Sequence, residues 1–115
     1  MLRATVRPGG QVKIILDGRQ SGKTYRLIQQ AAKDSLQIVC SNQREAERVF
    51  SEAGAMGVEI TFPLTAQAFL GRRFVGMGIR GFIIDNADWI LQELASPVPV
   101  EWISLTFDAQ EIEKP

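Results

Sequence analysis

The chain has 115 residues, of which 45% are hydrophobic, and it carries 13 basic and 13 acidic side chains. This length predicts one domain with a single core, and the balanced charge provides no global field that would attract nucleic acid or an anionic membrane. One cysteine (Cys40) and no histidine exclude an internal disulfide and a Ser-His or Cys-His nucleophile pair, and nearly exclude structural zinc. Neither a secretory signal nor a membrane-spanning stretch is present, so we expect a soluble, cytoplasmic protein without a membrane partner.

The first predicted elements follow a polar lead, residues 1–11. Residues 12–17 (VKIILD) are almost continuously apolar, which predicts a strand buried on both faces of a parallel sheet. A helix then begins near Gly22, with one apolar stripe made by Leu27, Ile28, Ala31 and Ala32. Residues 36–42 (LQIVCSN) predict a second buried strand.

A second helix is predicted from a capping box. Asn42 is its N-cap and Glu45 stands three residues later. Its apolar face consists of Ala46, Val49, Phe50 and Ala53, and Gly54 or Gly57 ends it.

The next segment, residues 58–62 (VEITF), alternates more and predicts a strand nearer an edge of the sheet. Pro63 closes this strand, and Thr65 caps the short helical segment AQAFLGRR. Residues 71–81 hold four glycines and three arginines, which predicts a mobile loop. The remaining predicted elements are a buried strand at 81–86, a helix at 87–95 stopped by Pro97, a strand at 101–108 and a frayed tail at 109–115.

This alternation of strands and helices predicts an α/β fold with a mostly parallel, five-stranded sheet between two helical layers. Residues 1–115 would form one domain of three layers, α/β/α. Ligands of such sheets bind beyond the carboxyl ends of the strands, where the chemically interesting residues of this chain lie.

The stretch DGRQSGKT, residues 17–24, matches a phosphate-binding loop (Walker A) in Gly22, Lys23 and Thr24. Such a loop turns backbone N–H groups toward the β-phosphate at a helix N-terminus. Its lysine neutralises the β- and γ-phosphates, and the hydroxyl holds Mg²⁺. Asp17 stands where the pattern has glycine, and its carboxylate repels phosphate mildly. The alternative is a strand-to-helix turn whose Ser-Gly simply begins the helix.

The stretch GFIIDNAD supplies an aspartate, Asp85, at the end of an apolar strand. A nucleotide hydrolase uses such a carboxylate as a second anchor for Mg²⁺ (Walker B). The pattern is weak alone, because many buried strands end in aspartate, and it gains weight from the upstream Gly-Lys-Thr.

Together, DGRQSGKT and GFIIDNAD resemble the nucleotide motifs of the additional-strand, RecA-like P-loop NTPases. Within that group the spacing resembles the first motor domain of superfamily 1 and 2 helicases and of phage terminase ATPases, and small phage and prophage ATPases look closest. IVCSNQREAERVF, ITFPLTAQAFL and WISLTFD are similar to the segments that accompany these motifs. The resemblance covers residues 12–108 and implies a RecA-like P-loop NTPase core, in the host cytoplasm if a phage encodes it.

The resemblance also implies roles for individual residues. Lys23 would bind the β- and γ-phosphates, Thr24 and Asp85 would hold Mg²⁺, and Thr106 would sense the γ-phosphate. The implied nucleotide-binding residues are Gly18, Arg19, Gln20, Ser21, Gly22, Lys23, Thr24 and Tyr25. Tyr25 either borders the base or packs on the sheet.

Asn86 departs from the family pattern, because such ATPases carry a glutamate there to orient the attacking water. An amide can bond to water but cannot accept its proton. Asp88 could replace the base only if the turn brings it inward, and otherwise it is a charge at a helix start.

Arg72, Arg73 and Arg80 have two interpretations. They could contact a nucleic-acid backbone or the active site of a neighbouring subunit, or they could be ordinary surface charges of a loop. Trp89 and Trp102 are explained by a core or a subunit interface.

We therefore expect Mg²⁺-dependent binding of ATP or another nucleoside triphosphate. Hydrolysis, if it occurs, would be attack of water on the γ-phosphate, helped by another copy of the chain or a DNA-processing protein. Two alternatives remain open: a nucleotide-gated binding module without hydrolysis, and a phage-type structural or accessory protein that kept the fold and lost the ligand.

Overall fold

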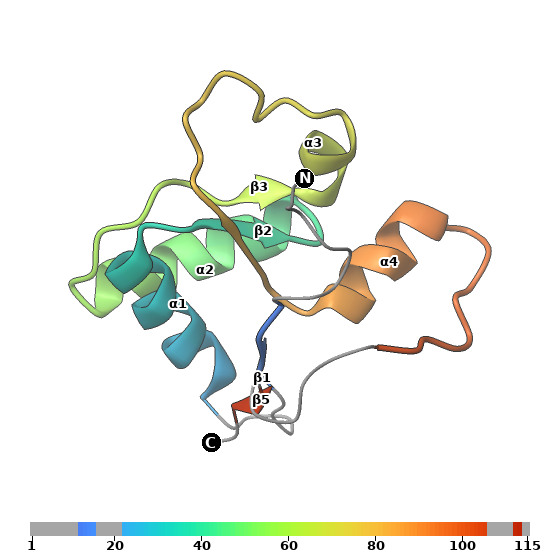
Figure 1. Cartoon of the computed structure of the whole chain (residues 1–115), viewed down its shortest axis with the longest axis horizontal. Helices are drawn as coiled ribbons and strands as arrows, with labels where there is room; N and C mark the ends of the chain where they lie inside the picture. Colours follow the sequence, from blue (N-terminus) through green and yellow to red (C-terminus); the bar gives the residue numbers. More distant parts are fainter. Residues whose placement is uncertain (1–11, 16–21, 106–111, 114–115) are drawn as a thin grey trace, which may run out of the picture. The chain divides into compact units, whose positions relative to one another are not determined.

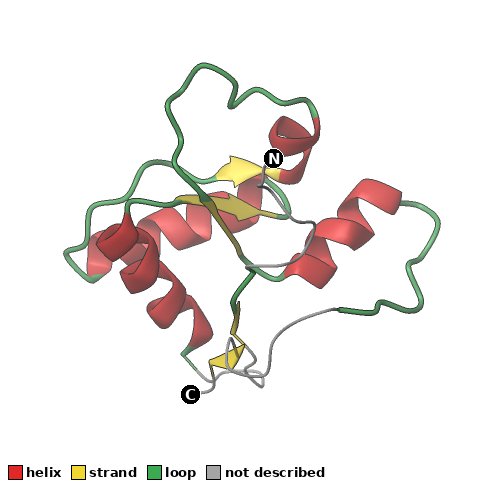
Figure 2. Ribbon diagram, viewed as in Figure 1, coloured by secondary structure: helices red, strands yellow, loops and turns green. Residues whose placement is uncertain are grey.

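The computed structural model describes residues 12–15, 22–105 and 112–113 (Figures 1 and 2). The chain divides into two compact units. The first consists of Met1–Lys23 with Glu101–Pro115, and the second of Thr24–Val100. The expected organisation as one domain stays a prediction, and the predicted polar lead lies outside the described residues.

A three-stranded parallel sheet organises the second unit. Its strands are β2 (Gln37–Cys40), β3 (Leu64–Thr65) and β4 (Phe82–Ile84), in the order β3-β2-β4. All four residues of β2 are buried, as a central strand covered on both faces requires. β4 is only partly buried, with Ile84 37% exposed. The prediction of a buried strand is therefore wrong here, because β4 is more exposed than predicted.

Four helices are formed by the residues that the structure describes: α1 (Lys23–Asp34), α2 (Gln43–Ala55), α3 (Ala66–Leu70) and α4 (Ala87–Ala95). The predicted bounds of α4 and the predicted start of α1 are confirmed. Within the described ranges, no helix has the length and apolarity needed to cross a bilayer.

The core lies on both faces of β2, because successive side chains of a strand point to opposite faces. Ile38 and Cys40 belong to a cluster with α1 and α2, made by Leu27, Ile28, Ala31, Ala46, Val49 and Ala53. Val39 points the other way and packs with Ala66 of α3 and Ile90 of α4. Figure 1 shows α1 and α2 lying together on one side of β2, away from α3.

Two members of the predicted apolar stripes lie outside this core. Ala32 is exposed. Phe50 is 44% exposed and instead packs its ring against Phe62, with ring centroids 5.2 Å apart. The other predicted members of both stripes are buried.

The predicted caps are confirmed. Asn42 Oδ1 accepts a hydrogen bond of 3.0 Å from the backbone N–H of Glu45, and Thr65 Oγ1 accepts one of 3.1 Å from Ala68. Such caps satisfy N–H groups that have no partner within the first turn of a helix. After α2, Gly57 adopts a left-handed φ of 72°, so of the two predicted helix ends Gly57 is the one used.

The expected five-stranded RecA-like core is wrong. The described strands form the three-stranded sheet and a separate parallel pair, β1 (Ile14–Ile15) with β5 (Ile112–Glu113). β1 covers two residues of the predicted strand at 12–17. Residues 112–113, expected in a frayed tail, are the partner of β1.

The predicted strand at 58–62 is also wrong, although its alternation is present. Val58 and Ile60 are half-buried, whereas Glu59 and Thr61 are exposed. The reason lies in Gln37 of β2, whose Nε2 donates to the carbonyl of Phe62 (3.0 Å) and whose Oε1 accepts from Thr61 Oγ1 (2.9 Å). Residues 61 and 62 therefore bond to the Gln37 side chain and form no backbone hydrogen-bond ladder with β2. Regular strand pairing begins only after Pro63, where Val39 pairs with Leu64.

The predicted strand at 101–108 is wrong over 101–105, and its remaining residues lie outside the described ranges. All five residues are exposed, Trp102 at 91%, so Trp102 is not part of the core. Upstream, the amide of Gln92 in α4 holds the backbone of Val100 at both polar groups. Nε2 donates to its carbonyl (3.0 Å) and Oε1 accepts from its N–H (2.9 Å). Val100 therefore bonds to a side chain rather than to a strand.

Gln37 generates the first prediction. Gln37→Leu removes two part-buried hydrogen bonds to residues 61 and 62 and should lower the free energy of unfolding by about 1–3 kcal/mol, since each such bond contributes about 0.5–1.5 kcal/mol. Chemical denaturation measures this change. Gln67→Leu, on the exposed side of α3, is the control and should stay within about 0.5 kcal/mol of the wild type. Equal stability of Gln37→Leu and wild type would contradict this role of Gln37.

Candidate functional site

The start of α1 holds the described part of the predicted phosphate loop. Gly22 has a φ of 84°, a conformation that glycine adopts at little cost. Lys23 and Thr24, both partly buried, are the first two residues of α1. The first turn of a helix points its backbone N–H groups outward along the helix axis, an arrangement that favours anions. Four other predicted loop residues, Gly18, Arg19, Gln20 and Ser21, and the anomalous Asp17 lie outside the described residues.

Tyr25 stands on the exposed side of α1. Its side chain is 50% exposed, and its hydroxyl accepts a hydrogen bond of 3.1 Å from Gln29 Nε2. The alternative that packed Tyr25 on the sheet is therefore wrong, and a border with a nucleotide base stays a prediction.

The junction of β4 and α4 positions Asp85, Asn86 and Asp88. The backbone N–H of Asp85 donates a hydrogen bond to the carbonyl of Val39 (2.9 Å). Asp85 is buried, with only 2% of its surface exposed. Asn86, the N-cap of α4, has a left-handed φ of 53°, which asparagine tolerates better than most residues. Asp88 is exposed in the first turn of α4, a position where its charge favours the helix dipole.

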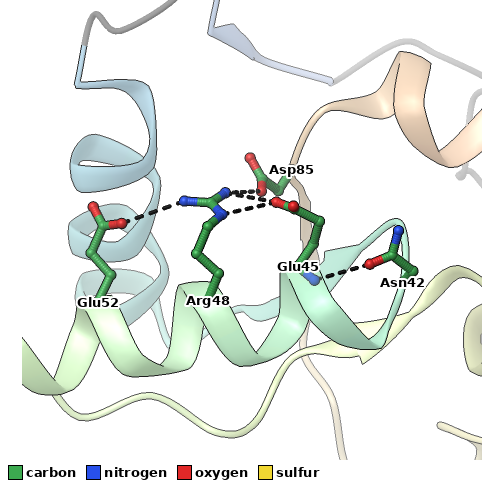
Figure 3. A network of polar contacts seen from close by, with 5 residues as sticks. All are labelled: Asn42, Glu45, Arg48, Glu52 and Asp85. Carbon is green, nitrogen blue, oxygen red and sulfur yellow. Dashed lines mark hydrogen bonds and ion pairs between the residues drawn. The ribbon is translucent and has the colours of Figure 1, made fainter.

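Arg48 of α2 connects Asp85 to two glutamates (Figure 3). Its Nη2 lies 2.9 Å from Glu45 Oε1 and 3.8 Å from Asp85 Oδ2, and its Nη1 lies 3.4 Å from Glu52 Oε1. The Nε–H also donates to Glu45 Oε1 (2.9 Å). Asp85 is therefore a buried carboxylate beside a guanidinium that is shared with two other acids.

The charges in this network shift two pKa values. Partial burial acts to lower the pKa of Arg48, but the hydrogen bond and charge of Glu45, together with Asp85 and Glu52, outweigh it and raise this pKa above its ordinary value. Burial raises the pKa of the Cys40 thiol to about 12, with further contributions from Asp85 and Glu45 and an opposing one from Arg48. Cys40 is thus an inert, protonated side chain of the core.

Sequence reasoning missed Arg48 and Glu52. Arg48 is three residues from Glu45 and four from Glu52, the spacings at which side chains on a helix form ion pairs. The pairs within α2 could therefore have been predicted from the sequence. The contact with Asp85 was not, because it depends on α2 packing beside the end of β4.

The three predicted loop arginines, Arg72, Arg73 and Arg80, are exposed. The described loop contains no regular element, as predicted, and Phe74 anchors it by packing against Phe69 and Phe82 at centroid distances of 5.6 and 5.0 Å. The guanidinium of Arg72 lies 5.7 Å from the Phe74 ring centroid, a cation–π distance.

An open hollow of about 280 Å³ lies where β2 ends beside α4. Its lining residues are Ser41, Asn42, Trp89, Gln92, Glu93 and Ser96. Trp89 is 48% exposed and forms part of this surface instead of the core.

The structure brings the predicted residues together in two groups. Gly22 to Tyr25 are consecutive at the start of α1, and Asp85, Asn86 and Asp88 meet at the start of α4. Gly22 and Lys23 belong to the first unit and Asp85 to the second, each described by itself. Thr106, the predicted γ-phosphate sensor, lies outside the described residues.

Cys40 generates a prediction for alkaline pH. Its folded pKa of about 12 lies above the ordinary 9.0, so the folded state holds this proton more tightly than the unfolded state does. The resulting stability is complete below pH 9 and is lost as pH rises toward 12. Denaturation of wild type and Cys40→Ala from pH 8 to about 10.5 should show a steeper loss in the wild type. Parallel pH profiles would contradict the assigned shift.

Comparisons with known proteins returned no match: no family model, no curated protein and no solved structure is similar to this chain.

Proposed function

We propose that this chain binds a nucleoside triphosphate, with ATP as the reference ligand, together with Mg²⁺. The observation that carries the proposal is the start of α1, where Gly22 with positive φ precedes Lys23 and Thr24 in the first helical turn. Backbone N–H groups at a helix N-terminus, a lysine and a hydroxyl are the groups that a polyphosphate needs.

The donor chemistry of the chain also suits Mg²⁺. This ion prefers oxygen ligands and is usually held by one or two carboxylates together with substrate phosphates and water. Thr24 offers a hydroxyl, and Asp85 offers a buried carboxylate at the carboxyl end of a parallel sheet, where ligands of such sheets bind. When bound, Mg²⁺ would supply positive charge to the β- and γ-phosphate oxygens.

The residues around Asp85 favour binding over efficient hydrolysis. Asn86 cannot accept a proton from water, and Asp88 is an exposed charge in the first turn of α4. Turnover would then depend on a partner, either another copy of the chain or a DNA-processing protein. Exposed Arg72, Arg73 and Arg80 are the residues proposed to reach such a partner or a nucleic acid.

A second candidate is a structural or accessory protein that binds no nucleotide. The burial of Asp85 beside Arg48 favours it, because an ion pair of this kind can be purely structural. Nucleotide binding at millimolar ATP separates the two candidates, since the structural protein would bind none.

Lys23 carries the decisive prediction for nucleotide binding. Lys23→Ala should weaken ATP binding more than about tenfold, because it removes a charge-assisted hydrogen bond to phosphate. Lys33→Ala, at the exposed end of the same helix, removes the same charge and should bind like the wild type. Isothermal titration calorimetry with and without Mg²⁺ measures both affinities. Equal affinities for the two variants would contradict the proposed phosphate loop.

Asn86 carries the prediction for hydrolysis. Asn86→Glu should raise γ-phosphate release if the missing base is the only defect, since a positioned general base contributes about 10²–10⁴-fold. Glutamate tolerates the left-handed φ of 53° less well than asparagine, so Asn86→Asp is the conformationally conservative version. Asp88→Asn should leave phosphate release unchanged. Unaltered release in both folded Asn86 variants would show that a further component is missing.

A further inference from the structure

We propose that Arg48 is a positioning residue whose guanidinium occupies the place beside the Asp85 carboxylate where Mg²⁺ would bind. Arg48 and Mg²⁺ therefore compete for this carboxylate. This inference rests on the proposed function, because it concerns how Asp85 becomes available to the metal. This role of Arg48 is not part of the predicted phosphate loop or of the predicted acidic strand end.

The geometry places the guanidinium on the one carboxylate proposed to hold the metal. Arg48 Nη2 lies 3.8 Å from Asp85 Oδ2, and Figure 3 shows the guanidinium reaching from α2 toward that oxygen. The guanidinium therefore already provides a positive charge at this oxygen. Mg²⁺ bound to the same oxygen would meet like charge, so the metal and Arg48 oppose each other there.

The contacts of Arg48 also allow it to move away. Its shortest ion pair is with Glu45, at 2.9 Å, whereas the contact with Asp85 is the longest of the three. Glu45 and Glu52 lie on the same helix as Arg48. The guanidinium can therefore leave Asp85 and keep both of its helical partners.

Burial distinguishes the two ends of the pair. The side chain of Arg48 is 43% exposed, whereas that of Asp85 is 1% exposed. Arg48 can turn into solvent at little cost, but Asp85 is held in place by the bond from its backbone N–H to Val39. The moving partner is therefore Arg48, and the fixed partner is the proposed metal ligand.

The charge of the cluster is consistent with an exchange of cations. Three carboxylates, those of Glu45, Glu52 and Asp85, share the guanidinium of Arg48 in this network. A divalent cation could take the place of Arg48 at Asp85 while Arg48 stays with the two glutamates of its own helix. Arg48 thus sets how much Mg²⁺ is needed to occupy the site.

The test measures the Mg²⁺ concentration that gives half-maximal ATP binding, by calorimetry of the whole chain. Arg48→Gln should lower this concentration about fivefold or more, because the competing charge is gone. Arg48→Lys keeps the charge and should stay closer to the wild type. The matched control is Arg44→Gln, which removes the same charge from an exposed position one turn earlier on α2 and should change nothing.

Each outcome decides the inference. A folded Arg48→Gln with an unchanged or raised Mg²⁺ requirement overturns it and leaves nucleotide binding intact. A wild type that binds no ATP overturns the proposed function and this inference together.

If Arg48→Gln fails to fold, the wild type itself provides the test. The NMR signal of the Arg48 Nε–H group, assigned with Arg48→Lys, should shift with ATP and Mg²⁺ together but not with ATP alone. A signal that Mg²⁺ leaves unmoved overturns the competition.

Discussion

The second unit depends on the burial of β2 on both faces. Three residues of this strand hold the unit together, since Ile38 and Cys40 pack against α1 and α2 on one side and Val39 packs against α3 and α4 on the other. The same strand receives the backbone N–H of Asp85 through the carbonyl of Val39. The hydrophobic core and the proposed metal ligand are therefore fixed by one element, and a change in β2 would be felt at the site.

The second constraint is the burial of charge at Asp85. Removing a carboxylate from water costs several kcal/mol unless a cation or hydrogen bonds compensate. Arg48 is one cation beside this carboxylate, and it also pairs with Glu45 and Glu52 at the edge of solvent. Burial of the neighbouring Cys40 thiol is the main cause of its raised pKa, and the charge of Asp85 adds to the effect.

The sequence predicted the helices better than the sheet. Local signals sufficed for α4, for the capped starts at Asn42 and Thr65, and for the apolar stripe of α1, because each is decided within a few residues. The strands failed where a side chain took over the backbone's partners, as Gln37 does at residues 61 and 62 and Gln92 does at Val100. The site divided in the same way. The positions of Asp85 after a strand and of Lys23 at a helix start were predictable from the sequence, whereas the contact of Arg48 with Asp85 arises from tertiary packing.

The clamp between Gln92 and Val100 also determines where the second unit ends. Its two hydrogen bonds close an eight-residue turn of chain onto α4, and the boundary between the units falls directly after Val100. The last fixed point of the unit is therefore a side-chain amide rather than a strand or a helix. A chain cut after Val100 would keep these two bonds, while one cut a residue earlier would lose both and leave the residues that follow α4 without this tie to the helix.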